Sequence, residues 1–214
     1  MKLSHRFYNL SSFQKRVYFF SIIFLLLIFL VLFSIVVFYY QLYISFLGFP
    51  ITLSIFAPFI DVPSGVKQNK LQYLSPLCLM ENKNDKIFIH GGTLFDYLFV
   101  LHKRIPPAQR KKIILKQFAE GLLHLIETEK EATKIEATTY ILNKRTAKKM
   151  GFSIAAPTFI QQLILSYNYI LLLISKSYAA GKLSFPKLSA TKKLTSDVES
   201  LKKNKAFLKR ISSD

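Results

Sequence analysis

Residues 17–60 read VYFFSIIFLLLIFLVLFSIVVFYYQLYISFLGFPITLSIFAPFI, a run of 44 positions without a charged residue. A bilayer core about 30 Å thick needs roughly 20 apolar residues in a helix that rises about 1.5 Å per residue. Apart from two serines and its final tyrosine, the segment Phe19–Tyr39 contains only Leu, Ile, Phe and Val. A cleaved signal peptide has a shorter apolar core and a small-residue cleavage site, which is missing here. The run therefore predicts a retained transmembrane helix within residues 17–47.

The run is longer than one span, so two layouts compete. In the first, one long helix ends near Gly48 and Pro50, and Ile51–Ile60 forms the first strand of a folded domain. In the second, a helical hairpin has Tyr43–Ile60 as its second arm, which Pro50 and Pro58 would interrupt. The alternation of β-branched residues from Ile51 onward favours the strand and hence the single helix.

The basic residues before the apolar run set its expected orientation. Lys2, Arg6, Lys15 and Arg16 precede it, and no basic residue follows its core for about 20 positions. This asymmetry predicts a cytoplasmic N-terminus at the membrane. A single span would place the domain outside, but long basic domains follow this rule poorly, so the side of the domain stays open. Tyr39, Tyr40 and Tyr43 are expected to form an interfacial aromatic belt.

The rest of the chain is long enough for one small domain of α/β or α+β class with a mixed sheet. We divide the chain into a basic segment (1–16), the transmembrane helix (17–47), the α/β domain (51–181) and a basic tail (182–214). Lys86–His90, Lys134–Leu142 and Phe152–Ala155 are expected to be strands, and residues 93–101 fit either a strand or a helix. Pro107–Glu129 is expected to be a helix, since proline is tolerated in a first turn and Ile114, Phe118, Leu122 and Leu125 form an apolar stripe.

Two later segments are less regular. Thr158–Ser175 is uncharged, but Gln161, Gln162, Ser166 and Asn168 are costly in lipid, so we expect a buried or interface-lying helix rather than a second span. The tail is rich in lysine and serine, and we expect a surface-attached or disordered segment with a short helix within residues 197–209.

The net charge of +18 indicates an anionic partner. With a membrane helix present, lipid headgroups are the simplest partner, and a protein complex is also possible. Nucleic acid is disfavoured because the aromatic residues lie in apolar runs rather than between the basic ones. The candidate headgroup contacts are Lys15, Arg16, Lys202, Lys203 and Lys205.

Metal chemistry and disulfides are not expected from this sequence. The four histidines have no ligand-like spacing, and no internal disulfide can form because Cys78 is the single cysteine. Between two leucines, Cys78 is expected to be a small buried side chain. Asp96 lies within an apolar run beside Gly91-Gly92. A buried carboxylate needs a partner, and Arg104 or Arg145 is expected to pair with Asp96. The alternative is that Asp96 is a catalytic general base.

One stretch resembles a known enzyme family. Residues 137–152 read ATTYILNKRTAKKMGF, a strand, an Asn at a helix start, a short basic helix, and Gly-Phe entering another strand. This is similar to the closing half of the GNAT-type acyltransferases, and the resemblance extends over residues 103–155. It implies acyl-CoA as cofactor, Tyr140 as acid catalyst and Asn143 as a pantetheine contact. It also implies a splayed pair of parallel strands near 95–101 and 135–142.

In that resemblance, the segment that starts at Pro107 occupies the pyrophosphate loop, with Arg110, Lys111 and Lys112 as the candidate cofactor contacts. The family's loop supplies glycines there so that backbone N–H groups reach phosphate, whereas this chain has Lys, Ile and Leu. Two function classes follow. The first is a non-catalytic membrane-anchored domain or complex subunit without a cofactor, and the alternative is a membrane-tethered acyl-CoA-dependent acyltransferase.

Overall fold

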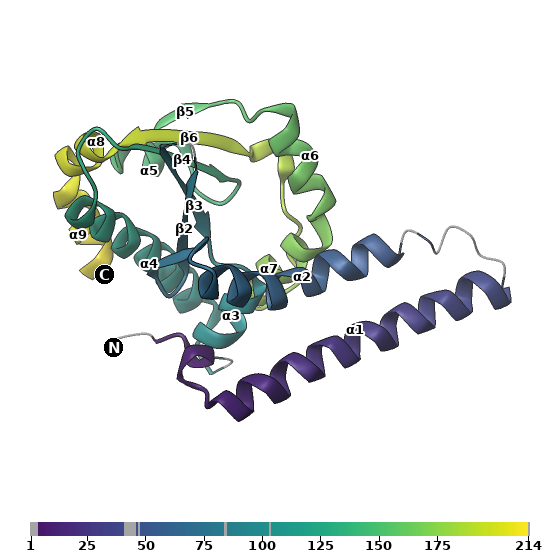
Figure 1. The fold of residues 1–214 in the computed structure, drawn as a ribbon. Helices are drawn as coiled ribbons and strands as arrows, with labels where there is room; N and C mark the ends of the chain where they lie inside the picture. The colour runs from purple at the N-terminus through teal and green to yellow at the C-terminus, as the bar shows by residue number, and fades with distance from the viewer. Residues whose placement is uncertain (1–3, 41–45, 47, 84, 103, 214) are drawn as a thin grey trace.

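A computed structural model describes residues 4–40, 46, 48–83, 85–102 and 104–213 of the chain. It has a mixed α/β fold, as the sequence predicts, with a six-stranded sheet in the order β1-β2-β3-β4-β6-β5. Two helices near the N-terminus project beyond the body of the domain, and the C-terminal helices lie at the opposite end (Figure 1). Lys2 and Tyr43, which entered the orientation and aromatic-belt predictions, lie outside the described residues.

The projecting helices are α1 (Ser12–Tyr40) and α2 (Gly48–Lys67), and each is long and apolar enough to cross a membrane. They pack side by side, with ring contacts between Phe29 and Phe56 and between Phe33 and Phe49. The strand predicted over Ile51–Ile60 is therefore wrong, and these residues are helical.

In α2, Thr52 and Ser54 are 4% and 3% exposed, whereas Leu53 is 48% exposed. Residues two positions apart lie about 200° apart around a helix, so Thr52 and Ser54 are buried on different sides of α2. Pro50 lies in the first turn, where no N–H bond is lost. Pro58 and Pro63 lie inside the helix, which membrane helices tolerate where neighbouring groups cover the freed backbone.

The sheet begins with three antiparallel strands, β1 (Gln72–Ser75), β2 (Cys78–Lys83) and β3 (Lys86–Gly91). β3 then pairs in parallel with β4 (Lys134–Thr139), which lies within the strand predicted over Lys134–Leu142. A parallel pair needs a crossover, and α3 (Leu94–Val100) and α4 (Pro107–Thr128) supply it. Residues 94–100 are helical, so the strand that the acyltransferase resemblance placed near 95–101 is wrong.

The main core lies between the sheet and α4, α8 and α9. Cys78, Leu122, Leu125 and Ile135 are among its fully or almost fully buried members. The predicted apolar stripe of α4 is confirmed, since Leu122 and Leu125 are buried and its other members are partly buried. Cys78 is also confirmed as a buried side chain, and burial raises the pKa of its thiol to about 12.

After β4 the chain forms α5 (Lys144–Lys149), β5 (Ser153–Ala155), α6 (Phe159–Tyr167) and α7 (Tyr169–Ala180). The segment 158–175, expected as one helix, is thus two helices that meet at a 69° bend. α7 packs against α3, α4 and α2, whereas α6 lies along the edge of the domain that carries α2 (Figure 1).

The predicted surface-attached or disordered tail is wrong. Lys192–Asp197 is β6, which lies between β4 and β5, and α8 (Val198–Lys203) and α9 (Lys205–Ser213) follow it. Leu194, Leu201 and Leu208 are fully buried in the main core. The lysine-rich composition hid this role because the lysines around these three leucines are half-buried or exposed and outnumber them. The short helix expected within 197–209 is present as two helices.

Candidate functional site

A buried polar cluster lies where the N-terminal segment meets the domain. Asp96, in the first turn of α3, is fully buried. Its Oδ1 accepts a hydrogen bond from the Tyr73 hydroxyl and lies 3.2 Å from Nε2 of His5. Its Oδ2 accepts hydrogen bonds from the backbone N–H and the hydroxyl of Thr93, at 2.6 and 2.8 Å. We call His5, Tyr73, Thr93 and Asp96 the Asp96 cluster.

The cluster has the electrostatics of a buried site. Burial, with the Asp96 carboxylate second, raises the pKa of Tyr73 well above its ordinary value. Burial also raises the pKa of the neighbouring Tyr8. The Tyr8 hydroxyl and Nδ1 of His5 are buried and have no hydrogen-bond partner among the residues that the structure describes. Both tyrosines therefore stay protonated near neutral pH, and each hydroxyl keeps a proton that it can donate in a hydrogen bond.

This cluster corrects the predicted partner of Asp96. Arg104 and Arg145 are exposed, and His5, which the sequence did not single out, occupies the expected place. A lone histidine 91 positions away gives no sequence signal of such a contact. Next to it, Arg6 donates from Nε and Nη2 to the carbonyls of Phe99 and Leu98, at 2.7 Å each. These contacts close the C-terminal end of α3, where carbonyls lack helical partners.

The second place with chemical potential is the carboxyl end of the parallel strand pair. Pairing between β3 and β4 ends at Ile89–Ala137, although β3 continues to Gly91 on β2 and β4 continues to Thr139 on β6. The two strands therefore separate over their last two residues. Tyr140 follows directly, half-buried, and burial raises its pKa to about 12. Burial also raises the pKa of the Tyr97 phenol, and the Tyr140 phenol adds to this effect.

At the start of α4, expected to face a pyrophosphate, Arg110 is engaged by the chain itself, while Pro107, Ala108 and Gln109 are exposed. Arg110 is buried, and it donates to the carbonyls of Ile105 at 2.8 Å and Tyr178 at 2.6 Å. Its guanidinium also lies over the Tyr178 ring. A Cβ at Gly181 would collide with the Pro107 ring, so the end of α7 sits directly against the first turn of α4.

The other candidate cofactor contacts are dispersed. Lys111 and Lys112 are exposed on α4. Asn143 is exposed, and its Oδ1 caps α5 by accepting from the Thr146 N–H at 2.8 Å. The structure therefore brings Asp96 into a cluster and leaves Tyr140 near the strand ends, but it does not bring Asn143 and the α4 residues to one site.

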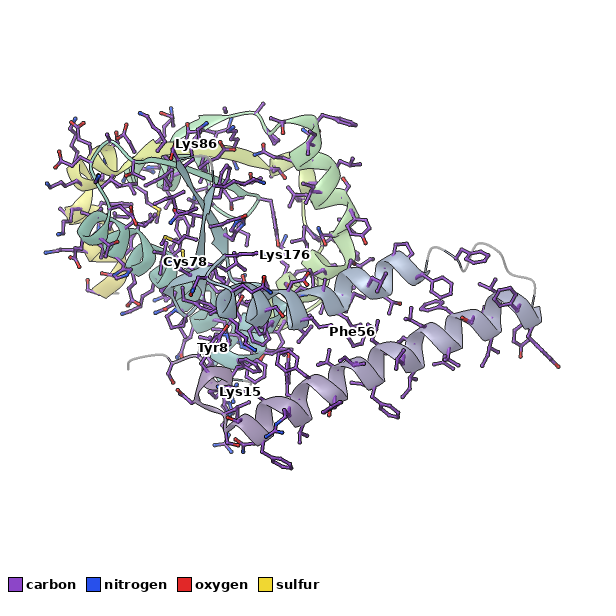
Figure 2. The ribbon with its side chains drawn as sticks, viewed as in Figure 1. Tyr8, Lys15, Phe56, Cys78, Lys86 and Lys176 are labelled. Atoms are coloured by element: carbon purple, nitrogen blue, oxygen red, sulfur yellow. The ribbon has the colours of Figure 1, made fainter. Side chains whose placement is uncertain are left out.

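The candidate lipid contacts divide into two groups. Lys15 and Arg16 lie in the first turn of α1, and Lys15 Nζ donates to the Tyr8 carbonyl at 3.1 Å. The other three, on α8 and α9, pair with glutamates: Lys202 with Glu131, Lys203 with Glu199 and Lys205 with Glu127. They lie at the end of the domain opposite α1 and α2 (Figure 1). Lys15 is labelled near the start of α1 in Figure 2.

Comparison with protein-family models, with curated proteins and with solved structures returns no match. Within the described ranges, no group of three or more His, Cys, Asp or Glu side chains is placed to hold a metal ion.

Proposed function

We propose that this chain is a membrane-anchored α/β domain with a non-catalytic role, such as that of a complex subunit, and that the domain lies on the cytoplasmic side. One observation carries the topology: the residues before α1 are attached to the domain that follows α2. His5 binds Asp96, and Arg6 binds the end of α3. A chain that leaves the domain through α1 and returns through α2 must cross the bilayer an even number of times.

The side follows from charge. Arg6, Lys15 and Arg16 lie at the domain end of the hairpin, and the uncharged run occupies the rest of it. Positive charge next to a span favours the cytoplasmic side. Because the N-terminal segment and the domain are joined, this rule now applies to both, which supports a cytoplasmic domain.

The contacts around the candidate residues support the non-catalytic role. The carboxylate of Asp96 is saturated by His5, Tyr73 and Thr93 and attaches the N-terminal segment. Such a saturated, fully buried carboxylate is suited to holding two elements together rather than to accepting a substrate proton.

Reporter fusions to the full chain test the topology. A reporter that is active in the cytoplasm and one that is active outside are each placed before Met1, after Tyr40 and after Asp214. The expected result is cytoplasmic activity at both termini and outside activity after Tyr40. Termini on opposite sides, or both outside, would overturn the proposed topology.

A membrane-tethered acyl-CoA-dependent acyltransferase is the second candidate, and the parallel pair of β3 and β4 favours it. The resemblance requires a splayed pair near 95–101 and 135–142. Residues 94–100 are helical, and the parallel pair that separates, after Ile89–Ala137, lies one strand earlier in the chain. Tyr140, which stays protonated at neutral pH, adjoins it as a proton donor. The carbonyl partners of Arg110 disfavour phosphate binding by that side chain. Calorimetric titration of the detergent-solubilised chain with acetyl-CoA tests this candidate, together with an assay of acyl transfer. The enzyme is supported if acetyl-CoA binds saturably and if Tyr140→Phe keeps that binding but abolishes acyl transfer. It is rejected if no heat of binding is measured at millimolar acetyl-CoA.

A further inference from the structure

The outer face of α6 carries a continuous apolar surface. Its five large side chains are 55–77% exposed. They are Phe159, Ile160, Leu163, Ile164 and Tyr167. At about 100° per residue they occupy one arc of about 140°, while Gln162 and Ser166 lie beside it on a polar exposed arc. A helix in water that exposes such an arc is unusual, since apolar surface of this extent marks a contact with lipid or protein.

α6 is attached at both ends, to the domain and to the hairpin. Gln161 donates to Glu136 on β4 at 3.1 Å, and Lys193 Nζ pairs with the same carboxylate at 2.9 Å. At the other end of α6, the Tyr167 hydroxyl donates to the Pro50 carbonyl of α2 at 3.2 Å. The apolar arc therefore continues into α2, whose Ile51 and Leu53 are also exposed.

We propose that the apolar face of α6 inserts into the bilayer beside α2, with bilayer lipid as its occupant. Continuity with the exposed side chains of α2 places α6 at the depth of a candidate span. The inference rests on the proposed membrane location of α1 and α2, and goes beyond it by fixing which side of the domain faces the bilayer.

The charge around this face fits anionic headgroups. No Asp or Glu occurs from Ala137 to Ser196. Lys182 and Lys187 are exposed and flank Leu183 and Phe185, which are exposed as well. The residues Leu188–Ala190 that follow them pack against α6, and lysines beside exposed apolar side chains are typical of segments that bind anionic membranes. The paired lysines of α8, at the far end of the domain, do not contribute to this surface.

Depth-dependent quenching in vesicles tests the proposal. The full chain is reconstituted in phosphatidylcholine containing phosphatidylglycerol, and single-cysteine variants are labelled with an environment-sensitive fluorophore. Cys78 can stay because it is fully buried. Leu163→Cys reports the apolar arc, Gln162→Cys the polar arc of the same helix, and Leu27→Cys the exposed middle of α1. We expect iodide quenching at position 163 to be at least about fivefold weaker than at 162, with strong quenching at 163 by nitroxide-labelled lipid near the headgroup.

The outcomes separate this inference from the membrane location itself. Equal iodide quenching at positions 162 and 163, with position 27 quenched by deep nitroxide lipid, would overturn the insertion of α6 alone. Weak quenching of 163 by both iodide and lipid would mean that protein covers the face, which also overturns it. Iodide access at position 27 would overturn the membrane location and this inference together.

Discussion

Nε2 of His5 lies 3.2 Å from Oδ1 of Asp96, although 91 positions separate the two residues. The chain between them contains both long apolar helices and the first three strands. The contact therefore makes the N-terminal segment part of the domain, and it converts α1 and α2 into a hairpin whose two ends are held at one place. Stability of this attachment depends on a carboxylate with no access to solvent.

Asp96→Ala should destabilise the chain strongly. Removing the carboxylate leaves His5, Tyr73 and Thr93 without their shared acceptor, and breaking a buried pair costs about 3–5 kcal/mol. Thermal unfolding of the full chain in detergent, together with protease sensitivity before Ser12, measures the loss. Asp85→Asn is the matched control, because Asp85 is an exposed carboxylate in the left-handed region that Asn also adopts. Equal melting temperatures for the two variants would contradict the anchoring role.

Arg110→Lys should lower the free energy of unfolding by about 1–3 kcal/mol, because lysine cannot reproduce both guanidinium bonds to the carbonyls of Ile105 and Tyr178. The loss should be the same with and without acetyl-CoA. Lys111→Ala, on the exposed side of the same turn, serves as control and should change stability by less than about 0.5 kcal/mol. A variant that keeps its stability but loses nucleotide binding would instead assign Arg110 to a phosphate site.

Leu201→Ala and Leu208→Ala should each cost about 2–5 kcal/mol, since both side chains are fully buried and truncation leaves cavities. Chemical denaturation of the detergent-solubilised chain provides the measurement. Lys209→Ala, next to Leu208 but exposed, should be nearly neutral. Neutral effects at all three positions would mean that the C-terminal helices are not part of the core.

Stability should fall at high pH through Cys78. Its pKa of about 12 in the folded chain exceeds the ordinary value of 9.0, so the unfolded chain loses its thiol proton first. The stabilisation is complete below pH 9 and is lost as the pH rises toward 12. The free energy of unfolding should therefore be lower by about 2 kcal/mol at pH 10.5. Denaturation at pH 8 and pH 10.5 should show a smaller alkaline loss for Cys78→Ala than for the unaltered chain.

Ellman's reagent provides an independent check on Cys78. The folded chain should react with it at pH 8 only after denaturation, because the thiolate is the reactive form and the thiol is buried. Fast labelling under native conditions, or an identical alkaline loss in Cys78→Ala, would refute the assignment.

The alternation Ile51-Thr-Leu-Ser was misleading as evidence for a strand. A period-two pattern of four residues is too short to distinguish a strand from a helix, and here these residues belong to α2, which runs from Gly48 to Lys67. The prediction of a surface-attached or disordered tail was wrong for a related reason. Composition averages over both faces of an element, so Leu194, Leu201 and Leu208 were diluted by exposed lysines.

The candidate site was only partly predictable. Asp96 was identified because a charge inside an apolar run must be compensated, but its partner was not, since pairing depends on distance in space. Arg110 was read as a phosphate ligand from its place at a helix start. Its actual carbonyl partners come from residues 105 and 178, and the second of these belongs to a helix whose packing no local pattern reveals.

By itself, the sequence determined the elements whose signal is local. These are the membrane-length apolar helix, the apolar stripe of the helix predicted over Pro107–Glu129, the strands that begin at Lys86 and Lys134, and the Asn143 cap. Local signals suffice there because periodicity, capping and hydropathy act over one or two turns. Only the tertiary structure decided that β6 completes the sheet, that α1 and α2 return to one place, and that His5 meets Asp96. Those features depend on contacts between residues far apart in sequence, which no window of the chain contains.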